Sequence, residues 1–147
     1  KEFKGVEHRL EYVRTINEVE YINDSKATNI NSVIVAINTY DQPIVLILGG
    51  FNKGANFRLL LPHIKSSHVR DIVSYGDAGG QINTALGDAV RSVQVTDLSS
   101  AVKKAQLMAA PGDIVLLSPG CASYDEFSNF EERGNHFKSI IKNIAIS

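Results

Sequence analysis

The stretch Ile44-Val45-Leu46-Ile47-Leu48-Gly49-Gly50 is an unbroken apolar run that ends at two glycines. Two further apolar runs extend from Ile72 to Tyr75 and from Ile114 to Leu117. Short runs without polar alternation are typical of strands that are buried on both faces, as in a parallel sheet covered by helices. We therefore predict an α/β fold with these runs as central strands.

Stretches with helical periodicity separate the apolar runs. Apolar residues recur at intervals of three and four in residues 31–39, 57–64, 80–86, 98–110 and 129–144. Strands that alternate with helices imply parallel strands joined by right-handed crossovers. With a further short strand from Val93 to Val95, the pattern predicts a Rossmann-like domain of three layers.

The amino-terminal part of the chain has a different pattern. Residues 10–16 and 19–22 alternate between apolar and polar side chains, and Asn17-Glu18 separates them, which predicts a β-hairpin. We expect this hairpin to add an antiparallel edge strand to a mostly parallel sheet. Since the chain begins at Lys1 without methionine and reaches this pattern almost at once, we predict that residues 1–147 are one domain cut from a longer protein.

Composition narrows the possible functions. The 147 residues are 44% hydrophobic and 21% charged, which suits one globular domain with its own core. The net charge is -1 without a basic stripe, so we expect no nucleic-acid partner. The apolar stretches are too short to span a bilayer. One cysteine and four scattered histidines predict neither a disulfide nor a zinc site, so we expect a cytoplasmic location and no metal ligands.

Two polar segments follow predicted strands and precede predicted helices. They are Asn23-Asp24-Ser25-Lys26-Ala27-Thr28-Asn29 and Ser118-Pro119-Gly120-Cys121-Ala122-Ser123-Tyr124-Asp125. Open α/β sheets bind ligands at the carboxyl ends of their strands, and helix amino-termini offer unpaired N–H groups to anions. The two segments therefore predict a site for an anionic substrate.

Several of these residues also have a purely structural interpretation. Asp, Ser and Asn are common helix caps, so Asp24, Ser25 and Asn29 could cap the helix that follows. Serine is also common in turns, so Ser118 and Ser123 could be turn residues. Lys26 is different, because a cation at a helix amino-terminus opposes the helix dipole and favours a negative ligand instead.

Cys121 is expected to pack as a small buried side chain, with a thiol nucleophile as the minor alternative. We expect Phe127 and Phe130 to belong to the core. Gly49-Gly50-Phe51-Asn52-Lys53-Gly54 does not fit G-x-x-x-x-G-K-[ST], and no G-x-G-x-x-G occurs, so the chain carries no P-loop. Lys53 is either a solvated loop lysine or the partner of a carboxylate or phosphate.

Taken as a set, these segments resemble the Mur ligase family of peptidoglycan synthesis. The resemblance covers nearly the whole chain in the same order, with Gly120 standing where alanine is about as common. Asp-Ser-Lys-Ala-Thr-Asn replaces the Asp-Tyr-Ala-His-Thr-Pro typical of sister ligases, which points to the branch that adds D-glutamate. The matching positions are His8-Arg9, residues 23–29 and 48–50, Lys53-Gly54, residues 117–125, Phe127, residues 129–131 and Arg133-Gly134.

The resemblance implies an ATP-dependent ligase that joins D-glutamate to UDP-N-acetylmuramoyl-L-alanine through an acyl phosphate. In this family a central domain carries the P-loop and provides most of the residues that bind ATP and Mg²⁺. An amino-terminal domain binds the UDP-sugar. Neither domain is expected in this chain, so we expect no catalysis by it alone and assign no catalytic residue.

Carried over position by position, the resemblance also implies site residues. Lys53 and Ser123 would meet the carboxylates of D-glutamate, while Tyr124 and Phe130 would offer mainly backbone groups. The full set for the amino acid is Lys53, Thr28, Ser123, Tyr124 and Phe130, with Lys26 close by. The set for the nucleotide is Arg9, Asp24 and His8, with the muramoyl substrate as an alternative for His8. Two other interpretations stay open, namely a non-catalytic module that senses an anionic metabolite and a Mur-type ligase for another amino acid.

Overall fold

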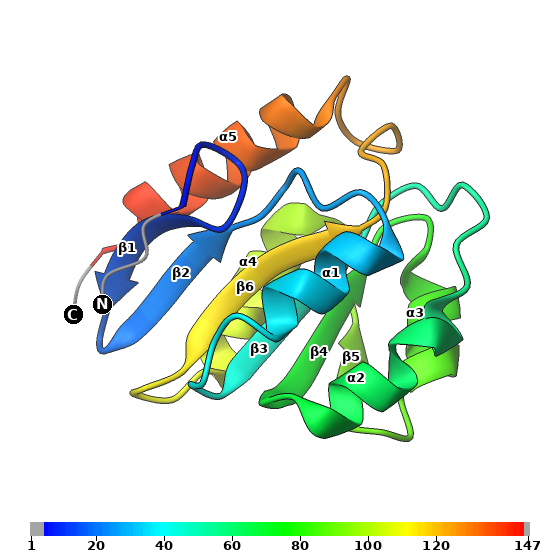
Figure 1. Ribbon diagram of the computed structural model, residues 1–147. Helices are drawn as coiled ribbons and strands as arrows, with labels where there is room; N and C mark the ends of the chain where they lie inside the picture. The colour runs from blue at the N-terminus through cyan, green and yellow to red at the C-terminus, as the bar shows by residue number, and fades with distance from the viewer. Residues whose placement is uncertain (1–4, 146–147) are drawn as a thin grey trace.

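The computed structural model describes residues 5–145, so the predicted start of the domain at Lys1 lies outside the described residues (Figure 1). Within residues 5–145 six strands form one sheet in the order β1-β2-β6-β3-β4-β5. β1 is antiparallel to β2, and the other neighbouring strands are parallel, which confirms the predicted sheet. The strands are β1 Glu11–Ile16, β2 Val19–Asn23, β3 Ile44–Gly49, β4 Val69–Tyr75, β5 Arg91–Gln94 and β6 Ile114–Gly120.

Helices cover both faces of the sheet. Figure 1 shows α1, α2 and α3 in front of the sheet and α4 behind it, and α5 packs with α4. The predicted three-layer architecture is therefore confirmed. The helices are α1 Ile30–Ile37, α2 Leu61–Ser66, α3 Gly79–Leu86, α4 Leu98–Met108 and α5 Phe130–Lys142, and the 3₁₀ turn η1 Phe57–Leu60 precedes α2.

The central strand β3 shows why the apolar run decides the fold. Leu46 and Leu48 pack into the core shared with α1, α2 and α3, while Val45 and Ile47 pack into the core shared with α4 and α5. All four side chains are fully buried. Each such side chain contributes about 1.5–3 kcal/mol through its removal from water. A strand that is buried on both faces has no place for polar alternation.

The hairpin forms at the predicted turn. Asn17 and Glu18 have φ angles of 52° and 66°, so both central residues adopt the left-handed conformation. Two successive positive φ angles are typical of the two-residue turn that matches the twist of antiparallel strands.

Several element boundaries differ from the prediction. β4 begins at Val69 and not at Ile72, and β5 is Arg91–Gln94 and not Val93–Val95. β6 continues beyond Leu117 to Gly120, because Gly120 still pairs with Gly49 of β3 after a shift in register. The helix predicted over 57–64 is divided into η1 and α2, and Pro62 lies in the first turn of α2. Proline lacks the N–H that a continuous helix would need there, so it begins a new helix instead.

Candidate functional site

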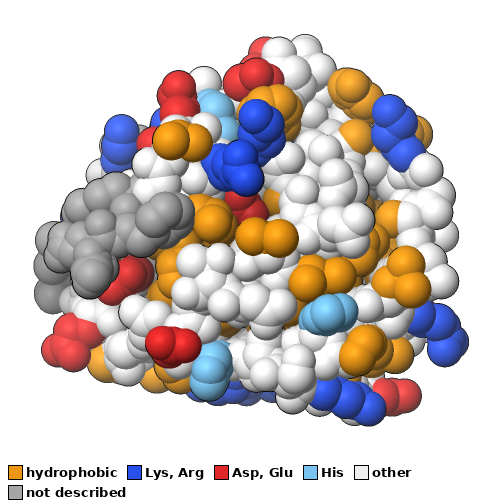
Figure 2. Space-filling model, in the orientation of Figure 1, with side chains coloured by type: hydrophobic (Ala, Val, Ile, Leu, Met, Phe, Trp, Pro, Cys, Tyr) orange, Lys and Arg blue, Asp and Glu red, His pale blue; other side chains and the backbone are white. Residues whose placement is uncertain are grey.

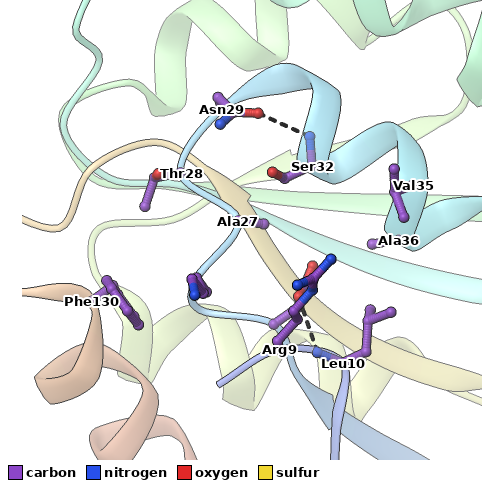
Figure 3. Close-up of a pocket in the computed structure, with 11 residues that line it drawn as sticks. Arg9, Leu10, Ala27, Thr28, Asn29, Ser32, Val35, Ala36 and Phe130 are labelled. Atoms are coloured by element: carbon purple, nitrogen blue, oxygen red, sulfur yellow. Dashed lines mark hydrogen bonds between the residues drawn. The ribbon is translucent and has the colours of Figure 1, made fainter. Parts of the chain in front are cut away.

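A cavity of about 410 Å³ lies at the carboxyl end of β2. Figure 3 shows that the amino-terminal segment, residues 27–29, α1 and the first residue of α5 surround it. We call it the first cavity. On the face shown in Figure 2, Lys and Arg side chains gather beside hydrophobic ones in the upper part of the view. The predicted site residues that line the first cavity are Arg9, Asp24, Lys26, Thr28 and Phe130. The apolar wall of this cavity includes Leu10, Val35 and Ala36.

A second cavity of about 470 Å³ adjoins the first. The loop at residues 53–56 and residues 120–122 at the end of β6 contribute to its walls, so Lys53 lies here and not with Lys26. Thr28 and Asn29 line both cavities. The structure therefore divides the predicted site between two adjoining cavities with a shared wall.

Three predicted site residues lie outside the lining of both cavities. Ser123 is buried, and its backbone oxygen accepts hydrogen bonds from the N–H groups of Glu126 and Phe127, as expected of a turn residue. The exposed ring of Tyr124 lies beside Lys53, 5.4 Å from its Nζ. His8 is buried, with its ring centroid 6.0 Å from that of Phe130.

The buried imidazole of His8 lies against α5 at Gly134. Its Nδ1 is 3.0 Å from Nδ2 of Asn23. A Cβ atom at position 134 would meet the imidazole, so only glycine fits this turn of the helix beside His8. The backbone oxygen of His8 accepts a hydrogen bond from Lys26 N–H at 2.9 Å. His8 therefore joins the amino-terminal segment to residues 24–29 and to α5.

The capping interpretation is correct for Asn29 but not for Asp24 or Ser25. Asn29 is the N-cap of α1, and its Oδ1 accepts a hydrogen bond from Ser32 N–H at 2.9 Å. The capping interpretation is wrong for Asp24, whose carboxylate accepts from Leu10 N–H at 3.0 Å and from Ser118 Oγ at 2.8 Å. It is also wrong for Ser25, whose Oγ donates to the backbone oxygen of Phe130 at 2.7 Å. The two residues hold distant segments together instead.

Asp24 is 4% exposed and lines the first cavity. Burial raises the pKa of its carboxyl from 3.8 to about 6, although the hydrogen bonds from Ser118 and Leu10 and the charge of Arg9 oppose the rise. Burial dominates because it removes water from the charged form. The carboxylate next to this cavity is therefore easier to protonate than an exposed one.

Replacing Asp24 with asparagine should change the pH dependence of stability. The folded state holds the proton more tightly than the unfolded chain, so ionisation of Asp24 lowers the free energy of unfolding as the pH rises from about 4 to about 6. The full penalty, at most about 3 kcal/mol, applies above this window and vanishes below it. Urea unfolding at several pH values should show Asp24→Asn gaining stability relative to the wild type across the window. Exposed Asp41→Asn is the control, and parallel curves for Asp24→Asn and the wild type would contradict the expectation.

Arg133 of α5 connects the two polar segments, a role that the sequence analysis did not assign. Its side chain is 0% exposed. Nε and Nη2 donate to the hydroxyl and backbone oxygens of Ser25 at 2.9 and 2.7 Å, and Nη1 donates to the backbone oxygen of Cys121 at 2.9 Å. The sequence did hold a signal, because Arg133 falls on the apolar face of the helix with Phe130 and Phe137.

The prediction for Cys121 is confirmed. The side chain is buried, and burial raises the pKa of the thiol to about 12, although the charge of Arg133 opposes the rise. A thiol with so high a pKa holds almost no thiolate at neutral pH, and thiolate is the nucleophilic form. Phe130, by contrast, lines the first cavity and is only partly buried, so the prediction of a core position is wrong for it.

Two further properties concern the described residues as a whole. Among residues 5–145, no three His, Cys, Asp or Glu side chains come close enough to share a metal ion. Nor does any helix of this range combine the length and hydrophobicity needed to cross a membrane.

Residues 8–121 match the family described as "Mur ligase, glutamate ligase domain", and the chain belongs to this family. It is 45% identical over 142 residues to UDP-N-acetylmuramoylalanine--D-glutamate ligase of Chloroherpeton thalassium, covering 97% of this chain and 30% of that protein. The ligase of the same name from Clostridioides difficile is 46% identical over 144 residues, covering 97% and 32%. The chain thus spans about a third of these curated relatives.

Solved structures share the fold at low sequence identity. UDP-N-acetylmuramate-alanine ligase from Thermotoga maritima superposes with a TM-score of 0.65 at 14% identity, covering 95% of this chain and 31% of that one. The bifunctional folylpolyglutamate synthase/dihydrofolate synthase from Yersinia pestis CO92 gives a TM-score of 0.66 at 16% identity, covering 93% and 32%. These structures confirm the predicted fold class.

Proposed function

We propose that this chain is the amino-acid-binding domain of a longer ATP-dependent ligase that joins D-glutamate to UDP-N-acetylmuramoyl-L-alanine in peptidoglycan synthesis. Two relatives named for this reaction are about 45% identical over nearly the whole chain. The observation that carries the proposal is the pair of adjoining cavities, each with a cation at its wall. Such a reaction needs an anionic amino acid and an anionic nucleotide held next to each other.

The second cavity suits one carboxylate of D-glutamate. Lys53 provides the charge, and Thr28 provides a hydroxyl on the shared wall. A carboxylate that accepts hydrogen bonds from an ammonium group and a neutral donor is well stabilised. Ser123 and the backbone of Tyr124 follow directly on the wall formed by residues 120–122, so they belong to the same proposed site.

The first cavity suits the nucleotide and its junction with the amino acid. Arg9 offers a planar guanidinium for phosphate oxygens, and the apolar wall next to it suits a less polar part of the ligand. Lys26 and Phe130 lie in the same cavity, so they would meet the amino acid where the two ligands approach each other. His8 would act by holding Arg9 and Lys26, because it is buried, precedes Arg9 in the chain and accepts a hydrogen bond from the N–H of Lys26.

Magnesium has no proposed site in this chain. The described residues bring no three potential ligands together, so they do not fit a metal centre of their own. We therefore assign no step to Mg²⁺ here. The P-loop and the magnesium ligands would belong to the two thirds of the relatives' length that this chain does not cover.

The test is phosphate release by the full-length protein with ATP, magnesium and UDP-N-acetylmuramoyl-L-alanine. D-Glutamate should support release, whereas L-glutamate, L-lysine and meso-diaminopimelate should not. Release with a different amino acid would keep the ligase class and overturn the substrate. A folded protein that releases phosphate with none of them would overturn the proposal and favour a metabolite-sensing module.

A further inference from the structure

Two loops that line the second cavity contact each other. The loop after β3 and the loop after β6 are joined by an isolated antiparallel bridge between Phe51 and Ala122. Phe51 N–H donates to the oxygen of Ala122 at 2.8 Å, and Ala122 N–H donates to the oxygen of Phe51 at 3.1 Å. The bridge holds the two loops together. Because its segments run in opposite directions, it does not itself pair Lys53 with Tyr124, and the contact between these two side chains is a separate feature of the loops.

An aromatic pair lies beside Lys53, which lines the second cavity. The ring centroids of Phe51 and Tyr124 are 6.4 Å apart with an interplanar angle of 60°. Nζ of Lys53 lies 5.4 Å from the centroid of the Tyr124 ring. An ammonium group within about 6 Å of an aromatic face is attracted by the negative charge of that face.

Core packing does not explain the two rings. Phe51 is 39% exposed and Tyr124 is 60% exposed, and neither belongs to the two buried core clusters. None of the ion pairs found among residues 5–145 includes Lys53. Its contact with Tyr124 therefore orients the ammonium group without neutralising its charge.

We propose that the Tyr124 ring, supported by Phe51, is a positioning element that holds the ammonium group of Lys53 at the wall of the second cavity. The inference rests on the proposed function and deepens it, because it assigns the side chain of Tyr124 a part in amino-acid affinity. A lysine side chain loses much rotamer freedom when a ligand fixes it. A ring that already restrains the lysine side chain reduces this loss of rotamer freedom. It also leaves the positive charge available to the ligand, whereas a neighbouring Asp or Glu would compete with the ligand carboxylate for the ammonium group.

Kinetics of the full-length protein test the role of the ring. Tyr124→Leu should raise the KM for D-glutamate about two- to five-fold, the effect of one exposed cation–ring contact, and should change kcat less than KM. Tyr124→Phe is the matched comparison, because it keeps the ring without the hydroxyl and should raise the KM less than Tyr124→Leu does. In a Lys53→Ala background, Tyr124→Leu should add no further increase, since the two residues act through one contact.

A spectroscopic readout separates this proposal from the proposed function. With selectively ¹³C-labelled lysine, the ring current of Tyr124 should shift the side-chain protons of Lys53 upfield. The shift should persist in Tyr124→Phe and disappear in Tyr124→Leu, whatever substrate the enzyme uses. If the shift persists in Tyr124→Phe and disappears in Tyr124→Leu, but D-glutamate supports no turnover, the proposed function is wrong and the contact between Tyr124 and Lys53 is still confirmed.

Three results would overturn the positioning role. One is an unchanged KM in Tyr124→Leu, and another is an equal rise in Tyr124→Phe, which would assign the effect to the hydroxyl. The third is an additive effect of Tyr124→Leu in the Lys53→Ala background. Because Tyr124 is largely exposed, all variants should fold, and thermal melting of each variant checks this expectation.

Discussion

Replacing Lys53 with alanine should raise the KM for D-glutamate about 30-fold and leave the KM for ATP within about two-fold of the wild-type value. Removing one partner of a charged hydrogen-bonded pair costs about 2 kcal/mol or more, and the lower end applies because Lys53 is exposed. ATP should be little affected, because Arg9 and Lys26 line a different cavity. Initial rates of phosphate release by the full-length protein measure both constants.

The control for this experiment is Lys103→Ala. Lys103 is an exposed lysine of α4, on the opposite side of the sheet from the two cavities, so its removal changes the net charge equally without touching the site. Equal increases in both KM values for Lys53→Ala would show that Lys53 serves the whole site and not the amino acid.

Replacing Arg133 with methionine should lower the free energy of unfolding by about 3 kcal/mol. The change leaves the backbone oxygens of Ser25 and Cys121 buried without their donors, at a cost of about 1–3 kcal/mol for each unsatisfied group. Relief from burying the guanidinium offsets part of this loss. Urea unfolding of the chain measures the change, and exposed Arg58→Met should stay within about 0.5 kcal/mol of the wild type.

Lysine should not rescue position 133. The guanidinium donates in three directions from one rigid plane, to the two oxygens of Ser25 and to the oxygen of Cys121. An ammonium group on a flexible stem cannot reproduce this fork. Wild-type stability in Arg133→Lys would mean that charge, not geometry, holds the two segments together.

Most of the fold could be predicted because it depends on local patterns. The apolar run of β3 and the turn at Asn17 and Glu18 indicated buried strands and a hairpin, and the structure confirms both. The end of β6 could not be predicted, because residues 118–120 have the composition of a loop. Their pairing with β3 depends on a partner about 70 residues away, which no local pattern reports.

The site could be predicted only in part, for a related reason. Strand ends placed the polar segments at one edge of the sheet, and the structure brings them together there. The role of Asp24 was missed because its partners Leu10 and Ser118 lie 14 and 94 positions away in the sequence. The division into two cavities depends on where α1 packs, so the spacing of residues 23–29 did not indicate it.

The wall shared by the two cavities has a thermodynamic consequence. Thr28 and Asn29 belong to both cavities, and Asn29 also caps α1, so any ligand that shifts these residues changes the other cavity as well. If occupation of one cavity changes the affinity of the other by some factor, the reverse effect must have the same factor. Binding of the nucleotide would then change the affinity for the amino acid, and the reverse, through Thr28 and Asn29. Such cooperativity would need no motion beyond the first turn of α1.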